Sequence, residues 1–142
     1  MNDPVIINEM LRSAQTIAVV GMSDKAWRAS HNIGRYLVMQ GYHVFPVNPA
    51  LTEVLGLKCY PDIESAQAAA QKDYAKGIDL VDVFRSSENV PPIVDDVIRL
   101  GIPYLWLQED VVNDKAIARA RAAGVKCVQD VCIFREHAQR VG

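Results

Sequence analysis

Cysteine is scarce and unpaired in this sequence. The 142 residues contain three cysteines, Cys59, Cys127 and Cys132, and no two of them form a C-x-x-C pair. An odd number without that spacing argues against both a disulfide framework and a zinc site. We therefore expect reduced thiols, as in the cytoplasm, and no structural metal.

Long apolar runs are also missing. No stretch approaches the roughly 20 consecutive apolar residues that a membrane-spanning helix needs. The first ten residues, MNDPVIINEM, lack the basic start and continuous apolar segment of a signal peptide. We expect a cytoplasmic protein with no membrane association.

An excess of basic charge is absent as well. The formal net charge is -2, with 15 basic and 17 acidic side chains, which does not favour a nucleic-acid partner. No Ser/His/Asp set, pair of catalytic carboxylates or cluster of metal ligands stands out, so we predict no catalytic residue and no metal ligand. Half of the residues are hydrophobic, and the length suits one domain spanning residues 1–142.

The sequence does contain a regular alternation of strand and helix patterns. Short, largely apolar segments without polar alternation, such as 16–21 (TIAVVG) and 79–84 (DLVDVF), are typical of parallel strands buried on both faces. Helix caps are expected at Asp3, Ser30 and Asn113. This alternation predicts an α/β fold, a three-layer sandwich with a mainly parallel sheet of five or six strands, in which 16–21 and 79–84 are central neighbours. The predicted strands are 16–21, 42–47, 57–60, 79–84, 104–108 and 125–129, with helices between them and a short helix after the last.

The loop after the first strand is the principal candidate site, because open α/β sheets bind ligands beyond the carboxyl ends of their strands. The loop begins at Gly21, but the next glycine is Gly34, so the G-x-G-x-x-G dinucleotide fingerprint is absent. The second strand runs into Asn48–Pro49 and offers no acid to the ribose of NAD. Lys25 and Arg28 precede a helix N-terminus, which favours anions. The pattern suits a ligand with a 3′-phosphorylated ADP group, such as coenzyme A (CoA).

Four segments, in this order, carry a more specific pattern: TIAVVGMSDKAWRASHNIGRYLVMQGYHVFPVNP, DLVDVFRSSENVPPIV, LWLQEDVVND and AGVKCVQDVCI. Together they resemble the small bacterial CoA-binding-domain proteins of the YccU-like group, over a stretch from about Ile6 to Ile133. The same type of domain forms the N-terminal part of the succinyl-CoA synthetase alpha subunit. The resemblance implies a single Rossmann-like domain that holds CoA or acyl-CoA at the carboxyl edge of its sheet.

The resemblance also implies which residues contact the ligand. The first loop would lie near the phosphates, the second would border the adenosine, and the third would form the opposite wall. Three positions depart from the family: Ala50 replaces a common lysine, Asp110 a common glycine, and Ile133 a proline. Met22 and Ser30 are added because they belong to the same loop after the first strand. The candidate ligand-binding residues are Gly21, Met22, Ser23, Lys25, Arg28 and Ser30; Asn48 and Pro49; Phe84, Arg85 and Ser86; Gln108; and Cys132.

The function expected from these observations is a stand-alone CoA or acyl-CoA binding protein without catalytic activity of its own. The larger synthetases carry a phosphorylated histidine on a separate domain, for which this chain has no room, so ligase activity is not expected. Two alternatives stay open. One is an NAD(P)-binding oxidoreductase or redox-sensing Rossmann domain, and the other is a protein-interaction module whose cleft is unused.

Overall fold

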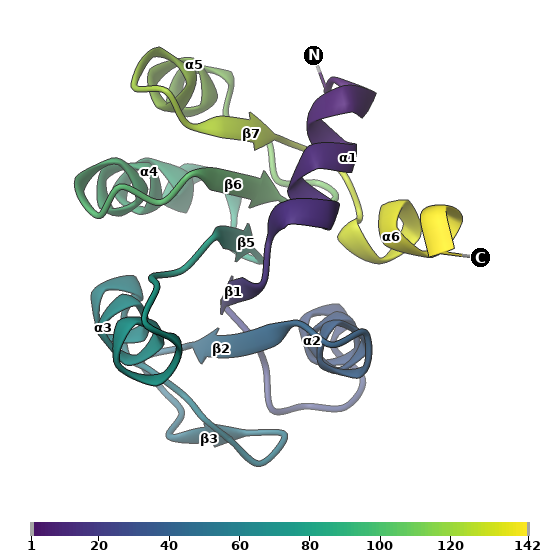
Figure 1. Ribbon diagram of the computed structural model, residues 1–142, viewed down its shortest axis with the longest axis vertical. Helices are drawn as coiled ribbons and strands as arrows, with labels where there is room; N and C mark the ends of the chain where they lie inside the picture. Colours follow the sequence, from purple (N-terminus) through teal and green to yellow (C-terminus); the bar gives the residue numbers. More distant parts are fainter. Residues whose placement is uncertain (1, 142) are drawn as a thin grey trace.

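A five-stranded parallel sheet runs through the middle of the protein (Figure 1). In the computed structural model, which describes residues 2–141, the strand order is β2-β1-β5-β6-β7. All four neighbouring pairs are parallel. The predicted sheet is therefore confirmed, with β1 and β5 as inner neighbours. The strands are β1 (Thr16–Val20), β2 (His43–Val47), β5 (Leu80–Val83), β6 (Tyr104–Leu107) and β7 (Lys126–Val128).

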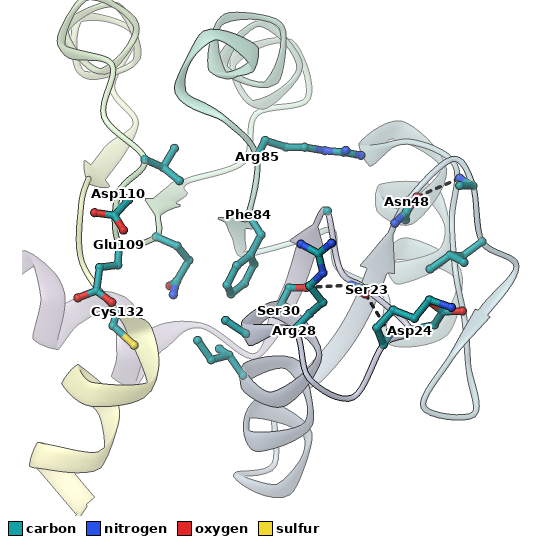
Figure 2. A pocket seen from close by; sticks show the side chains of 18 residues that line it. Ser23, Asp24, Arg28, Ser30, Asn48, Phe84, Arg85, Glu109, Asp110 and Cys132 are labelled. Atoms are coloured by element: carbon teal, nitrogen blue, oxygen red, sulfur yellow. Dashed lines mark hydrogen bonds between the residues drawn. The ribbon is translucent and has the colours of Figure 1, made fainter.

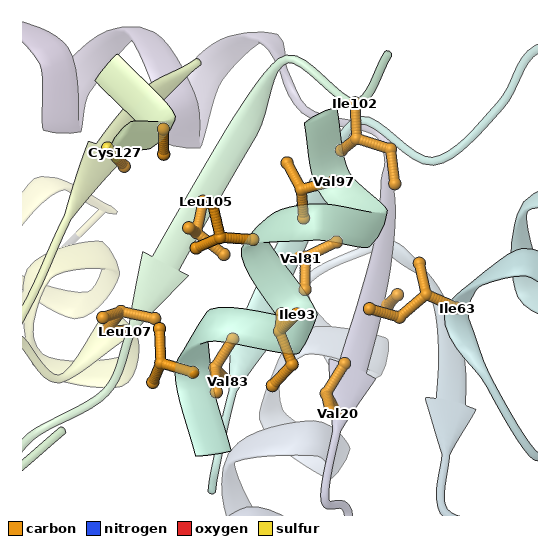
Figure 3. Packing of buried hydrophobic residues seen from close by; sticks show 14 of the residues in the cluster. Val20, Ile63, Val81, Val83, Ile93, Val97, Ile102, Leu105, Leu107 and Cys127 are labelled. Atoms are coloured by element: carbon orange, nitrogen blue, oxygen red, sulfur yellow. The ribbon is translucent and has the colours of Figure 1, made fainter. Parts of the chain in front are cut away.

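Strands β1 and β5 are buried along their whole length, which explains why their sequences show no polar alternation. Successive side chains of a strand point to opposite faces. Val20 and Val81 pack into the hydrophobic core on one face (Figure 3), whereas Ile17 and Leu80 pack into the core on the other. Each strand thus contributes to two cores.

Helices cover both faces of the sheet, three on each side within residues 2–141 (Figure 1). The apolar sides of α3, α4 and α5 belong to one core, and those of α1, α2 and α6 belong to the other. The predicted three-layer sandwich is confirmed. The helices are α1 (Pro4–Ser13), α2 (Ala29–Met39), α3 (Ile63–Tyr74), α4 (Val90–Arg99), α5 (Asp114–Ala122) and α6 (Ile133–Val141), and a short 3-10 turn, Ser87–Asn89, precedes α4.

The helix starts are set by side-chain caps, with one correction to the sequence analysis. Asp3 and Asn113 accept hydrogen bonds of 2.9 and 3.0 Å from backbone N–H groups in the first turns of α1 and α5, as predicted. The predicted cap of α2 by Ser30 is wrong. The helix begins at Ala29, with Arg28 at the N-cap position, and the Ser30 hydroxyl bonds to the preceding loop instead.

The predicted strand 57–60 is the second point of difference. Only Leu57–Lys58 is a strand (β4), and it pairs antiparallel with β3 (Glu53–Val54) in a hairpin outside the main sheet. Leu55 and Gly56 at the tip both have positive φ, 56° and 74°, the backbone that a two-residue hairpin turn requires. Leucine is unusual in that conformation, so the sequence carries no clear hairpin signal here.

The two edge strands of the main sheet, β2 and β7, differ in what limits further strand pairing. Strand β2 contains Pro46, a residue found on edge strands because it has no N–H to donate. Tyr60 then lies against β2, donating its backbone N–H to the Pro46 carbonyl at 2.9 Å and forming a single parallel bridge with Val47. The opposite edge, β7, has only three residues and begins with the exposed Lys126.

Candidate functional site

The carboxyl ends of β1 and β5 lie at the point where the chain changes direction across the sheet. From β1 the chain crosses to β2 on one side, and from β5 it crosses to β6 on the other. Such a switch point is where open α/β sheets bind ligands. A cleft of about 840 Å³ opens there, here called the carboxyl-edge cleft (Figure 2). Its lining comes from α2 and from the loops after all five strands: Gly21, Ser23, Asp24, Lys25, Arg28, Ala29, Ser30 and Ile33; Asn48, Ala50 and Leu51; Phe84 and Arg85; Gln108, Glu109, Asp110 and Val111; and Cys132.

At the floor of the cleft, two backbone segments lie very close to each other. Gly21 has φ +84°, and a Cβ placed there would lie 2.3 Å from the carbonyl oxygen of Phe84. The Gly21 N–H donates to the Val47 carbonyl, and the Phe84 N–H donates to the Val20 carbonyl, both at 2.8 Å. The glycine therefore lets three strand ends meet without a gap.

The loop between β1 and α2 is held by its own polar side chains. The Ser30 hydroxyl accepts a 2.9 Å hydrogen bond from the Ser23 N–H, and the Ser23 hydroxyl accepts one of 3.0 Å from the Lys25 N–H. Nδ1 of His31 lies 3.0 Å from the Ser23 carbonyl, so this nitrogen carries the proton and donates it. The loop that presents Lys25 and Arg28 is thus preorganised.

Asn48 joins the first two loops. Its amide nitrogen donates to the Met22 carbonyl, and its amide oxygen accepts from the Ala50 N–H, each at 3.0 Å. The side chain is committed to the scaffold at one edge of the cleft, so the carboxyl end of β2 carries an amide where an NAD-binding fold has an acid.

Charge is unevenly divided across the cleft: three cations and Asp24 lie towards one end, and two carboxylates lie towards the other (Figure 2). Lys25, Arg28 and Arg85, here called the basic side, form no side-chain hydrogen bond or ion pair within residues 2–141. Glu109 and Asp110 form the acidic side. Arg135 holds Glu109 through two contacts of 2.6 and 3.0 Å, and this pairing lowers the pKa of the Glu109 carboxyl.

Asp110 also has an unusual backbone. Its φ is +69°, in the left-handed region that glycine adopts freely and that aspartate and asparagine tolerate better than other residues. The glycine that the family resemblance implies at this position would adopt the same conformation freely. The aspartate keeps the turn and adds a negative charge to the cleft.

Ten of the thirteen residues expected from the sequence line the cleft, and Met22, Pro49 and Ser86 do not. Met22 is fully buried and packs over Gly34, where a Cβ would lie 2.3 Å from the methionine methyl carbon. Pro49 is exposed beside the cleft. The Ser86 hydroxyl accepts a 2.7 Å hydrogen bond from the Asn89 amide before α4. Contact of any of the thirteen with a ligand stays a prediction.

The cleft also includes residues that the sequence analysis did not select. Ala29 and Ile33 are one helical turn apart, so they lie on the same face of α2. That spacing was a usable signal once the helix start was known. The full set is Asp24, Ala29, Ile33, Ala50, Leu51, Glu109, Asp110 and Val111.

At the far end of the cleft, Gln108 and Cys132 lie beside the start of α6. Gln108 is buried, and its side-chain oxygen accepts a 3.1 Å hydrogen bond from the Ile133 N–H, which fixes the first turn of α6. Cys132 is partly exposed, whereas burial raises the pKa of the Cys59 and Cys127 thiols. Cys132 is therefore the accessible cysteine of the three.

A buried acid lies close to the site without entering it. Asp82 of β5 is fully buried, and neither of its oxygens has a hydrogen-bond partner among the described residues. Burial raises the pKa of this carboxyl well above its usual value. Burial therefore favours the neutral, protonated form of this carboxyl.

Two classes of site are absent from residues 2–141. No group of three or more histidine, cysteine, aspartate or glutamate side chains is placed to hold a metal ion. No helix in this part of the chain has the length and apolar character needed to cross a membrane.

Known proteins of similar sequence and structure share this fold. The YneT protein of Bacillus subtilis (strain 168) is 34% identical over 132 residues, which cover 93% of this chain and 92% of that protein. A hypothetical protein from Pyrococcus horikoshii OT3 has a TM-score of 0.86 and 34% identity, over 99% of this chain and 94% of its own. The dinucleotide-forming acetyl-coenzyme A synthetase 1 of Ca. Korarchaeum cryptofilum has a TM-score of 0.68 and 25% identity, over 86% of this chain but 27% of its own.

The sequence profile of one family covers most of the chain. The profile described as the CoA binding domain matches residues 15–138, from the start of β1 into α6. This span includes every strand of the sheet and the whole lining of the carboxyl-edge cleft. The chain belongs to the CoA binding domain family.

Proposed function

We propose that the protein binds CoA in the carboxyl-edge cleft, as a stand-alone module without catalytic activity of its own. The observation that carries the proposal is the basic side, where Lys25, Arg28 and Arg85 present charges that have no ion-pair partner among residues 2–141, at the switch point of the sheet. CoA offers a pyrophosphate and a 3′-phosphate to such charges. Membership of the CoA binding domain family supports the same ligand.

The uneven distribution of charge predicts the orientation of CoA in the cleft. The phosphates and adenosine would lie on the basic side, near Asn48 and Leu51, because the acidic side repels them. The uncharged pantetheine arm would then extend past Phe84 and Gln108 and bring its thiol towards Cys132. Cys132 and Asn48 lie at opposite ends of the cleft in Figure 2, as this orientation requires.

NADP is the second candidate ligand, since its 2′-phosphate would also be attracted to the basic side. The absence of an acid at the end of β2 counts against NAD but not against NADP. The two ligands differ in the position of the extra phosphate and in the group attached beyond the pyrophosphate, which is pantetheine in CoA and nicotinamide riboside in NADP. A direct comparison of affinities separates them.

The test is isothermal titration calorimetry with CoA, dephospho-CoA, NAD and NADP. CoA should bind most tightly, and dephospho-CoA should bind less tightly because it lacks the 3′-phosphate. Lys25→Ala and Arg28→Ala should each weaken CoA binding by about tenfold, the lower range for a hydrogen bond to a charged group. The loss should be larger at low salt, where phosphate contacts are less screened.

The matched control is Lys72→Ala, which removes the same charge from an exposed position on α3 away from the cleft. Its CoA affinity should equal that of the wild type. NADP binding more tightly than CoA would contradict the proposal, as would equal losses in all three variants. No binding of any of the four would favour an interaction module with an unused cleft.

A further inference from the structure

A second, apolar groove lies between α2 and α6. Its volume is about 290 Å³, and it is lined by Asn32, Ile33, Arg35, Tyr36, Met39 and Phe134. We call it the α2/α6 groove. Met39 and Phe134 are large apolar side chains with 75% and 42% of their surface exposed. Side chains of this kind cost free energy when they face water, so a groove that contains two of them favours an apolar occupant.

The base of this groove is held in place by aromatic contacts. The Tyr36 and Phe134 rings meet edge to face, with their centroids 4.7 Å apart. The Tyr36 hydroxyl lies 2.7 Å from Nδ1 of His137, so its polar group is already satisfied within the protein. Arg35, at the groove, bonds to the Asn32 amide oxygen at 3.3 Å. The groove therefore presents ring faces and aliphatic carbon together with the exposed guanidinium of Arg35.

The groove and the carboxyl-edge cleft adjoin at a shared lining residue. Ile33 lines both of them. Cys132 lines the cleft and Phe134, two residues further on, lines the groove, so the start of α6 also borders both. This junction is the end of the cleft to which the proposed orientation brings the thiol of CoA.

We propose that the α2/α6 groove holds the acyl chain of an acyl-CoA, so that the ligand of this protein is a medium-chain acyl-CoA. The inference rests on the proposed function, because it needs the CoA portion in the carboxyl-edge cleft with its thiol at Cys132. A thioester formed on that thiol starts at Ile33 and directs its chain along the groove. Ile33, Tyr36 and Met39 span six residues of α2, about 9 Å along the helix. The groove ends with Met39, where the helix itself ends, so a longer chain would extend into water.

The test is calorimetry with CoA, acetyl-CoA, octanoyl-CoA and palmitoyl-CoA, each below its micelle concentration. Octanoyl-CoA should bind at least about tenfold more tightly than CoA, because each methylene removed from water contributes up to about fourfold. Palmitoyl-CoA should gain little over octanoyl-CoA, since the extra carbons pass beyond Met39. Acetyl-CoA should bind like CoA.

The test variant is Met39→Glu, and the readout is the ratio of octanoyl-CoA affinity to CoA affinity. The ratio cancels any effect of the new charge on the shared CoA portion. It should fall by about fourfold or more, the contribution of at least one methylene. The matched control is Val5→Glu, which makes the same kind of change at an apolar residue that is 70% exposed on α1, outside both the cleft and the groove. Its ratio should equal that of the wild type.

The outcomes separate this inference from the proposed function. If CoA itself does not bind, both fail. If CoA binds and the octanoyl-CoA ratio is near one, or is unchanged by Met39→Glu, only the acyl-chain inference is overturned. A wild-type dimer that Met39→Glu converts to a monomer, measured by light scattering, would assign the groove to a second copy of the chain and also overturn it.

Discussion

Replacing Gly21 with alanine tests the backbone contact that closes the carboxyl-edge cleft. The new Cβ would lie 2.3 Å from the Phe84 carbonyl oxygen, well inside the 3.0 Å that real Cβ atoms keep. It would also lie 3.1 Å from the Phe84 carbonyl carbon. Because these atoms follow β5, which pairs with β1, the overlap is relieved only if the two central strands separate at this end.

The expected loss of stability has two parts. An alanine at φ +84° carries the cost of the left-handed conformation, about 1–2 kcal/mol. Overpacking of a buried position adds about 1–3 kcal/mol. The sum is about 2–5 kcal/mol for Gly21→Ala. Gly101→Ala is the control, since Gly101 has φ +69° and no atom lies within 4 Å of its added Cβ. That variant should lose only the conformational part.

The assay is urea unfolding of the wild type and the two variants, with unchanged m-values as the condition for comparing midpoints. Gly21→Ala should lose about 1–3 kcal/mol more than Gly101→Ala, which is the overpacking part alone. It should also lose affinity for CoA, whereas Gly101→Ala should keep it. Equal destabilisation by the two substitutions would refute the close approach as the reason for glycine at position 21.

Three further predictions concern side chains in or near the site. Asp82 binds its proton more tightly in the folded protein, so the wild type loses stability as pH rises above the ordinary carboxyl pKa of 3.8. The stability of Asp82→Asn relative to wild type should therefore increase from pH 4 to pH 8, as measured by urea unfolding. A difference that stays constant with pH would exclude a buried neutral acid. Asp110→Asn keeps a side chain that tolerates positive φ and removes a repelling charge. Calorimetry should show CoA affinity increased by about twofold, the size expected for a charge screened by water at cleft distances. A decrease in affinity would contradict the uneven charge of the cleft. Incubation with CoA disulfide should add one CoA to Cys132, whose thiolate attacks the disulfide and releases the other CoA as a thiol. Intact-mass measurement should show an adduct that a reductant removes, on the wild type and on Cys127→Ser. An adduct that survives in Cys132→Ser would place the reactive thiol elsewhere.

The central part of the fold could be predicted because its residues allow few alternatives. The segments around Ile17 and Val81 are too short for amphipathic helices and apolar on both faces, so only a doubly covered strand buries them. Parallel strands then bring their carboxyl ends to one edge, which places Gly21, Arg85 and Cys132 together before any coordinates are known.

The rest depended on contacts that the sequence pattern does not encode. Ser30 has the residue type of a helix cap, but its hydroxyl bonds to the Ser23 N–H, a choice decided by the path of the loop. Met22 follows Gly21 directly, yet the turn directs its side chain into the core against Gly34. Asp82 interrupts an otherwise apolar strand, and nothing local indicates that its carboxyl is buried without a partner among the described residues. Each of these outcomes is set by tertiary packing rather than by residue preference.

The construction of the sheet edges determines how copies of this chain can associate. An exposed edge strand can template pairing with another chain, which leads to aggregation or to fibres. At the β2 edge, Pro46 offers no N–H and its carbonyl is taken by Tyr60. At the β7 edge, a three-residue strand beginning with a lysine gives a short, charged template. Sheet extension across molecules is therefore disfavoured at both ends, and any assembly of this protein is expected to use helical surfaces rather than strand edges.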